Sequence, residues 1–239
     1  MLSALILYEK FIFPMIIGMD VIRTQIPVIP VRAKRGEMVS GEFVINGTTV
    51  KMSSSGDGTV RYSETLSSLS KAYGKDLPLL VIDADGMRRR DIEPGVLKKM
   101  KATRSIWLMT GIRNSGDVMD AFHGDIEKLI VPYHMTTDTD LKEMTELSDS
   151  CFPALFADRE GVYARKGKRP LRDVMRTLTN MNFRKILLFA AGDGPEDVLW
   201  DVRDHCEMII PYCNGNKDDI GRIGEMGFSD VMVPFYELI

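Results

Sequence analysis

The feature that most constrains this chain is a repeated alternation between short apolar runs and amphipathic segments. Eight runs of seven to ten residues are rich in Val, Ile, Leu and aromatic residues and are bounded by turn residues. Runs of this length and composition predict strands that are buried on both faces. The expected strands span residues 13–22, 77–86, 105–112, 127–133, 152–158, 185–192, 206–212 and 229–235.

Most gaps between these runs hold one amphipathic helix, expected at residues 94–102, 115–124, 139–147, 170–182, 195–205 and 217–227. Strand, helix and strand in succession are typical of parallel crossover units. We expect a closed (β/α)8 TIM barrel rather than an open doubly wound sheet. The eighth strand ends the chain, and no dinucleotide-binding glycine pattern follows the first strand. Residues 1–239 form one domain in this prediction.

Corresponding strands of the two halves end in similar ways. Three features recur at offsets of 102, 108 and 104 residues, namely Pro132 and Pro234, Asp85-Gly86 and Asp193-Gly194, and Gly111 and Gly215. The first and fifth expected strands each end in an aspartate, Asp20 and Asp158. The sequence therefore predicts a half-barrel internal repeat.

The gap between the first two strands is unusually long, at more than fifty residues. Asn46-Gly47 lies between two alternating segments, which predicts a β-hairpin with a type I′ turn. Residues 26–39 supply a further strand before it, and residues 63–74 predict the first outer helix. We expect the hairpin to form a flap at the carboxyl end of the barrel. Residues 2–11 are expected to form a helix that replaces the missing eighth outer helix.

The net charge of −3 argues against a general nucleic-acid or membrane-surface binder. The apolar start lacks a basic segment and is interrupted by Glu9-Lys10, so a cytoplasmic protein is expected. The three cysteines of the chain do not have the spacing of a disulfide framework, so we expect reduced thiols. His205-Cys206 with Cys213 lacks a fourth ligand, so small half-buried side chains are favoured over a metal site. We expect neither a metal nor a cofactor.

Three segments carry a family resemblance: "TVRYSETLSSLSKAYGKDLPLLVIDADG", "TGIRNSGDVMDAF" and "FADREGVYARKG". They resemble three motifs of the histidine-biosynthesis barrels: the run from the first loop into strand 2, the strand 3 motif and the strand 5 motif. This family comprises the ribotide isomerase and the cyclase subunit of imidazole glycerol phosphate synthase. The resemblance implies an Amadori-type isomerisation or a ring closure on a phosphorylated ribotide. It also implies a general acid and a general base at the ends of strands 1 and 5, positions that Asp20 and Asp158 match.

We assign Asp158 as the base and Asp20 as the acid, because Arg159 favours a charged carboxylate and the apolar run around Asp20 favours a neutral one. Pro132 and Pro234 stand where the family has phosphate-binding glycines, and each removes a backbone donor. We therefore expect poor turnover of the histidine-pathway ribotide. The substrate-binding candidates are Arg23, Asp85, Gly111, Arg113, His134, Arg159, Gly192 and Gly215.

Arginines and lysines gather in the segments expected after strands 1, 2, 3 and 5: Arg23, Arg32, Lys34, Arg35, Arg88 to Arg90, Arg113, Arg159, Arg165, Lys166, Lys168 and Arg169. Basic side chains gathered at the carboxyl end of the barrel, here called the mouth, suit an anionic small-molecule substrate. The alternative is that they form a solvated basic rim with no ligand. Two functions remain open. One is a divergent isomerase acting on an anionic metabolite, and the other is a non-catalytic barrel for ligand sensing or partner binding. The oligomeric state is also open.

Overall fold

The structure, a computed structural model, describes residues 22–52, 59–74, 77–92, 94–98, 105–122, 126–190 and 195–239. Within these residues a series of parallel ladders joins eight strands side by side. Their order is β14 (Asp230–Pro234), β1 (Thr24–Lys34), β6 (Leu79–Asp83), β7 (Ile106–Met109), β8 (Lys128–Pro132), β9 (Cys151–Asp158), β12 (Ile186–Ala190) and β13 (Ile209–Pro211).

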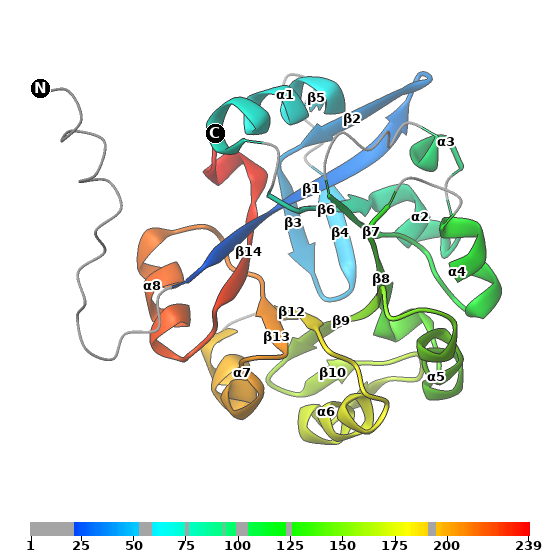
Figure 1. Cartoon of the computed structure of the whole chain (residues 1–239), viewed down its shortest axis with the longest axis vertical. Helices are drawn as coiled ribbons and strands as arrows, with labels where there is room; N and C mark the ends of the chain where they lie inside the picture. Colours follow the sequence, from blue (N-terminus) through cyan, green and yellow to red (C-terminus); the bar gives the residue numbers. More distant parts are fainter. Residues whose placement is uncertain are drawn as a thin grey trace, which may run out of the picture.

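The two ends of this series approach each other. An isolated parallel bridge pairs Tyr212, just after β13, with Met232 of β14. The N–H of Cys213 donates to the carbonyl oxygen of Met232 at 3.0 Å. Figure 1 shows the strands following one another around a common centre with helices outside them. The chain is thus a mixed α/β fold with a mostly parallel sheet in a barrel-like arrangement.

The helices follow the strands as the sequence predicts, although several are shorter. They are α1 (Tyr62–Tyr73), α2 (Ala84–Arg89), α3 (Pro94–Leu97), α4 (Ser115–Ala121), α5 (Asp138–Leu147), α6 (Leu171–Asn180), α7 (Pro195–Val202) and α8 (Lys217–Glu225). Side-chain caps fix several starts: Asn114 accepts from the N–H of Asp117, and Thr137 forms a capping box with Asp140. The helices α4 and α5 therefore begin at defined residues.

The first strand of the sheet differs from the prediction. The run at 13–21 lies outside the described residues, and Ile22 precedes the first strand. The place between β14 and β6 belongs instead to β1, through parallel registers such as Val28 to Pro234 and Val31 to Asp83. We expected residues 26–39 to supply only a further strand before the hairpin. Pro27 and Pro30 each remove a ladder donor, and proline is rare in central strands, so this central place is unusual. The expected helix at 2–11 also lies outside the described residues.

Two hairpins follow β1. β1 pairs antiparallel with β2 (Glu37–Gly41), which in turn pairs with β5 (Thr59–Arg61). The β1–β2 turn has positive φ at both Arg35 (51°) and Gly36 (81°), as a type I′ turn requires. β3 (Phe43–Asn46) and β4 (Thr49–Met52) form the expected second hairpin. Its loop is Gly47-Thr48 and only Gly47 of the two has positive φ, so the predicted type I′ turn at this place is wrong.

The two prolines that recur in the sequence end their strands alike. Pro132 closes β8 and leads into a 3-10 turn, η1 (Tyr133–Met135), and Pro234 closes β14 and leads into η3 (Phe235–Glu237). A third short 3-10 turn, η2 (Arg203–His205), follows α7. In chain order, β1 and β9 are the first and fifth of these eight strands. Each continues into an antiparallel partner, which for β1 is β2 and for β9 is β10 (Gly161–Tyr163), followed by β11 (Lys168–Arg169).

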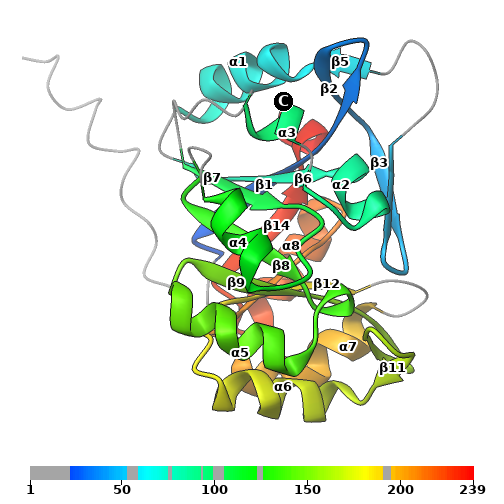
Figure 2. The ribbon, with the colours of Figure 1, turned by 90° about the vertical axis from the view of Figure 1, so that its right-hand side faces the viewer.

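The β3–β4 hairpin, hereafter the flap, packs on the sheet through its apolar side. It forms a separate two-stranded sheet. Phe43 and Val50 are buried in the same apolar cluster as the strand residues Ile82 and Phe156, whereas Val44 on the other side is 66% exposed. Figure 1 shows the flap drawn across the centre of the strands, and Figure 2 shows it standing beside α2 at one side of the sheet. The flap therefore covers the space beyond the strand ends.

Candidate functional site

A cavity of about 660 Å³ lies between the flap, Arg32 near the end of β1 and the segments that follow β6 and β8. These segments leave the carboxyl ends of parallel strands, which is where α/β folds bind ligands. We call this space the basic cavity. Its charged and polar lining is Arg32, Thr48, Thr49, Lys51, Asp85, Arg88, Arg90 and His134. Its volume lies within the range that small-molecule sites occupy.

The basic cavity carries strong positive charge in a chain of net negative charge. Four cationic side chains and one carboxylate line it, a formal balance of 4 − 1 = +3, against −3 for the whole chain. The carboxylate, Asp85, is paired with Arg88 at 3.1 Å. Arg32, Lys51 and Arg90 form no ion pair with another described residue. The lining is therefore suited to a ligand with negative charge.

Arg32 comes from β1, one residue beyond the end of its ladder with β6. Its Nε atom is buried and has no hydrogen-bond partner among the described residues. Leaving a buried donor unpaired costs about 1–3 kcal/mol, and more for a charged group. An acceptor that reached this nitrogen would remove the cost, and Arg32 borders the cavity.

His134 lies in η1 directly after the strand end at Pro132. The residue is 6% exposed, its ring stands edge-on to Phe156 at 5.3 Å, and its Nδ1 is buried without a hydrogen-bond partner in the described part of the chain. Burial, and secondarily the charge of Arg90, lowers the pKa of His134 to about 4. The imidazole is therefore neutral at pH 7, with one donor and one acceptor nitrogen.

Arg90 occupies a backbone conformation that arginine seldom adopts. It caps the carboxyl end of α2 with φ of 55° and ψ of 49°, and its N–H donates to the carbonyl oxygen of Gly86. Glycine is the usual residue in this left-handed position, because a side chain costs about 1–2 kcal/mol there. Strain of this kind concentrates at functional sites. The chain thus keeps a cationic side chain beside the cavity at a cost in stability.

Aromatic side chains fill the centre of the strand ends. Phe156 stacks on Phe189 with ring centroids 4.9 Å apart, and Phe189 contacts Tyr212 at 5.5 Å. Phe43 of the flap lies 6.1 Å from Tyr212. β1 contains no aspartate or glutamate. In the described residues the centre of the mouth is therefore apolar, and the polar groups lie to one side of it.

Asp158, the predicted base, ends β9 in a network of close contacts. Its carboxylate accepts hydrogen bonds from Lys168 at 2.6 Å, from the Tyr163 hydroxyl at 2.7 Å and from the N–H of Glu160 at 3.0 Å. Burial alone would raise the pKa of Asp158, but these hydrogen bonds outweigh it and hold the pKa below its ordinary value. The charged form is favoured as predicted, although through Lys168 and not through Arg159, which pairs with Asp197 at 2.9 Å.

Asp158 and Arg159 border a different cavity, of about 550 Å³, on the side of α6 and α7. Asp20 and Gly192, the other catalytic candidate and one glycine candidate, lie outside the described residues. Arg23 is at the opposite rim from the one predicted: its N–H bonds the carbonyl oxygen of Ser229, and the next residue pairs with the first residue of β14. The error follows from placing the first strand too early.

Three further candidates have structural contacts. A Cβ on Gly111 would lie 2.2 Å from the backbone nitrogen of Asp91, so this glycine permits close packing of two backbone segments. Arg113 binds Asp117 through its Nε at 3.0 Å and through its backbone N–H at 2.8 Å. Gly215, at φ of 85°, packs against the side chain of Glu237. None of the three lines the basic cavity.

The structure thus brings together two of the predicted site residues, Asp85 and His134, with Arg32, Arg88 and Arg90 of the predicted basic segments. Sequence analysis missed Lys51. The signal for it was weak, because its place over the mouth depends on how the flap folds back. Asp85 both lines the cavity and pairs with Arg88, while Asp83 caps α2 and accepts a hydrogen bond from the Thr110 hydroxyl at 2.8 Å.

Within the described ranges, no group of three or more His, Cys, Asp or Glu side chains is placed to hold a metal ion. No helix in that part of the chain has the length and apolar character needed to cross a membrane. Comparison of the sequence with models of known protein families and with curated proteins finds no match. The functional argument therefore rests on the geometry and charge of the site.

Proposed function

We propose that this chain is a (β/α)8 barrel with a half-barrel repeat that binds a small anionic metabolite in the basic cavity, beneath the flap. One observation carries the proposal. Arg32 Nε and His134 Nδ1 are buried and have no hydrogen-bond partner among the described residues. Both residues border the same cavity, where cations outnumber carboxylates by four to one. Buried polar groups are normally hydrogen-bonded, so two that converge on one cavity indicate an absent binding partner.

The charge balance indicates a ligand with two or more negative charges. Lysine and arginine heads that face one cavity repel each other, and a dianion compensates several of them at once. Arginine forks recognise phosphate and carboxylate oxygens through paired N–H donors. A phosphorylated compound is therefore the ligand class that this lining supports best. Donors from arginine replace the backbone donors that Pro132 and Pro234 remove.

Binding is supported better than the acid–base isomerisation that the family resemblance implies. That reaction needs a proton donor and a proton acceptor on opposite sides of the substrate, and the resemblance assigns both roles to carboxyl groups. In the described residues Asp158 is held in three hydrogen bonds, β1 offers no carboxylate, and aromatic rings occupy the space between. A ligand-sensing or partner-regulating role fits these features. An isomerase acting on the bound anion is the catalytic form of the proposal.

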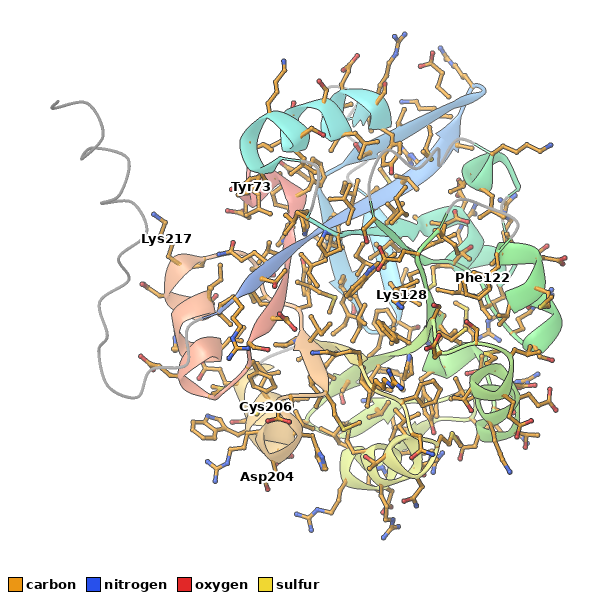
Figure 3. All side chains as sticks on the ribbon, in the orientation of Figure 1. Tyr73, Phe122, Lys128, Asp204, Cys206 and Lys217 are labelled. Carbon is orange, nitrogen blue, oxygen red and sulfur yellow. The ribbon has the colours of Figure 1, made fainter. Side chains whose placement is uncertain are left out.

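Thermal unfolding in inorganic phosphate tests the binding site directly. A ligand that binds only the folded state stabilises it by RT ln(1 + [L]/Kd), so Tm should rise with phosphate at constant ionic strength. The variant Arg32→Met/Lys51→Met should lose most of this rise. Lys217→Met is the matched control, because Lys217 is exposed on α8, away from the cavity (Figure 3). An equal phosphate response in the double variant and the control would refute the basic cavity as the site.

A further inference from the structure

We propose that His134 binds a hydroxyl group of the ligand, so that the ligand of the basic cavity is a phosphorylated polyol and not a bare oxyanion. This inference rests on the proposed function, because it assumes that the cations of the cavity hold the anionic group. Hydrogen bonding by the imidazole adds a second means of recognising the ligand, alongside the charge of the cations. It also assigns a specificity-determining role to a residue that contacts the ligand.

The position of His134 leaves its ring little freedom. The side chain follows Pro132, whose φ is fixed, and stands at 85° to the plane of the Phe156 ring. Phe156 is itself fully buried and stacked on Phe189. Locked rotamers of this kind pre-organise a binding group, because little conformational entropy is lost when the ligand arrives. The imidazole is thus a rigid edge of the cavity.

The chemistry of the ring differs from that of the cations around it. An ionised phosphate oxygen accepts hydrogen bonds, and the arginine and lysine heads only donate them. A neutral imidazole both donates and accepts, and a hydroxyl group can meet either nitrogen. The charge of nearby Arg90 disfavours protonation of the ring. His134 is therefore complementary to the neutral part of a ligand whose charged part lies on the arginines.

A purely structural role explains less of what is observed. A buried histidine that serves packing alone normally donates a ring N–H to a carbonyl or carboxylate. The His134 ring has no such hydrogen bond within the described structure, and it borders a cavity with room for a ligand of ordinary metabolite size. Phenylalanine would pack on Phe156 equally well without an unpaired nitrogen. The imidazole is thus retained for a partner that comes from the cavity.

The experiment measures binding of inorganic phosphate, glycerol 3-phosphate, ribose 5-phosphate and glucose 6-phosphate by calorimetry. The variants are His134→Phe, which keeps the ring packing, and His134→Gln, which keeps a donor and an acceptor. At least one polyol phosphate should bind the unchanged protein about tenfold or more tighter than phosphate. His134→Phe should lower the ratio of polyol phosphate affinity to phosphate affinity about tenfold, and His134→Gln should restore part of that ratio. Melting curves confirm that each variant is folded.

The outcomes separate the two proposals. If phosphate binds through Arg32 and Lys51 but no polyol phosphate binds more tightly, the His134 inference is wrong and the proposed function stands. If His134→Phe weakens phosphate and polyol phosphates alike, His134 acts on the shape of the whole site and the inference is again overturned. If phosphate does not bind at all, the proposed function fails and the inference fails with it.

Discussion

Replacing Arg90 by glycine should make the protein more stable while weakening anion binding. The left-handed backbone at φ of 55° costs an arginine about 1–2 kcal/mol, and glycine removes this cost. Glycine also gains about 0.5–1 kcal/mol of conformational entropy in the unfolded chain, which offsets part of the benefit. The net gain should be about 0.5–1 kcal/mol. For a chain of 239 residues this corresponds to a rise in Tm of roughly 1–4 °C.

The same substitution removes one cation of the basic cavity. A hydrogen bond to a charged group contributes about 1.5–3 kcal/mol when shielded and less near solvent, so phosphate affinity should fall about tenfold. The assay is a pair of measurements on one sample. Melting without phosphate gives the change in stability, and a phosphate titration gives the change in affinity. The two should move in opposite directions.

Arg35→Gly is the matched control. Arg35 also has a left-handed backbone, with φ of 51°, and carries the same charge, but it lies in the β1–β2 turn outside the lining of the basic cavity. It should raise Tm by a similar amount and leave phosphate affinity unchanged. If Arg90→Gly leaves phosphate affinity as high as Arg35→Gly does, Arg90 does not belong to the binding site. A lower Tm for Arg90→Gly would show that its side chain stabilises the fold.

Three other outcomes follow from the contacts. Burial lowers the pKa of His134 from 6.5 to about 4, so between these pH values the unfolded chain binds a proton that the folded chain does not. The free energy of unfolding should therefore fall by up to about 3 kcal/mol as the pH drops from 6.5 to 4, and urea titrations of His134→Phe should show a smaller dependence on pH. Asp158→Asn breaks the ion pair with Lys168, so chemical denaturation should show a loss of about 1–3 kcal/mol with phosphate affinity unchanged, and weaker phosphate binding would return Asp158 to the ligand site. Gly111→Ala places a Cβ 2.2 Å from a backbone nitrogen and should lower the free energy of unfolding by about 2 kcal/mol or more. In Gly221→Ala, in α8, the new Cβ meets nothing within 4 Å, and the free energy of unfolding should rise by about 0.5–1 kcal/mol. Similar Tm values for the two variants would contradict the packing described at Gly111.

The sequence predicts most of the parallel strands because each is a short apolar run between turn residues. Seven of the eight expected strands coincide with β6, β7, β8, β9, β12, β13 and β14 within a few residues. The first does not, because two effects oppose each other there. Residues 13–22 look more like a buried strand, while β1 carries Pro27 and Pro30, which local rules assign to strand ends or edges. Tertiary pairing with β14 and β6 outweighs the lost donors.

The site is predicted only in part, for a related reason. Basic residues after strand ends can be recognised in sequence, and Arg32, Arg88 and Arg90 do meet in one cavity. Which of them remain unpaired depends on neighbours distant in sequence, as the pairing of Lys168 with Asp158 and of Arg159 with Asp197 illustrates. The absence of partners for Arg32 Nε and His134 Nδ1 is likewise a property of the folded structure. Sequence alone supplies the groups but not their hydrogen bonds.

In the part of the chain that the structure describes, the flap shares no backbone ladder with the main sheet, and this separates its local stability from that of the strands beneath it. Its attachment rests on the burial of side chains such as Phe43 and Val50 and on a long hydrogen bond, at 3.4 Å, from the Tyr236 hydroxyl to the carbonyl oxygen of Phe43. Amide hydrogens of residues 43–52 should therefore exchange through local detachment, well before global unfolding. A ligand that joins Lys51 on the flap to Arg32 on β1 would slow that exchange, so protection of this one segment reports occupancy of the cavity.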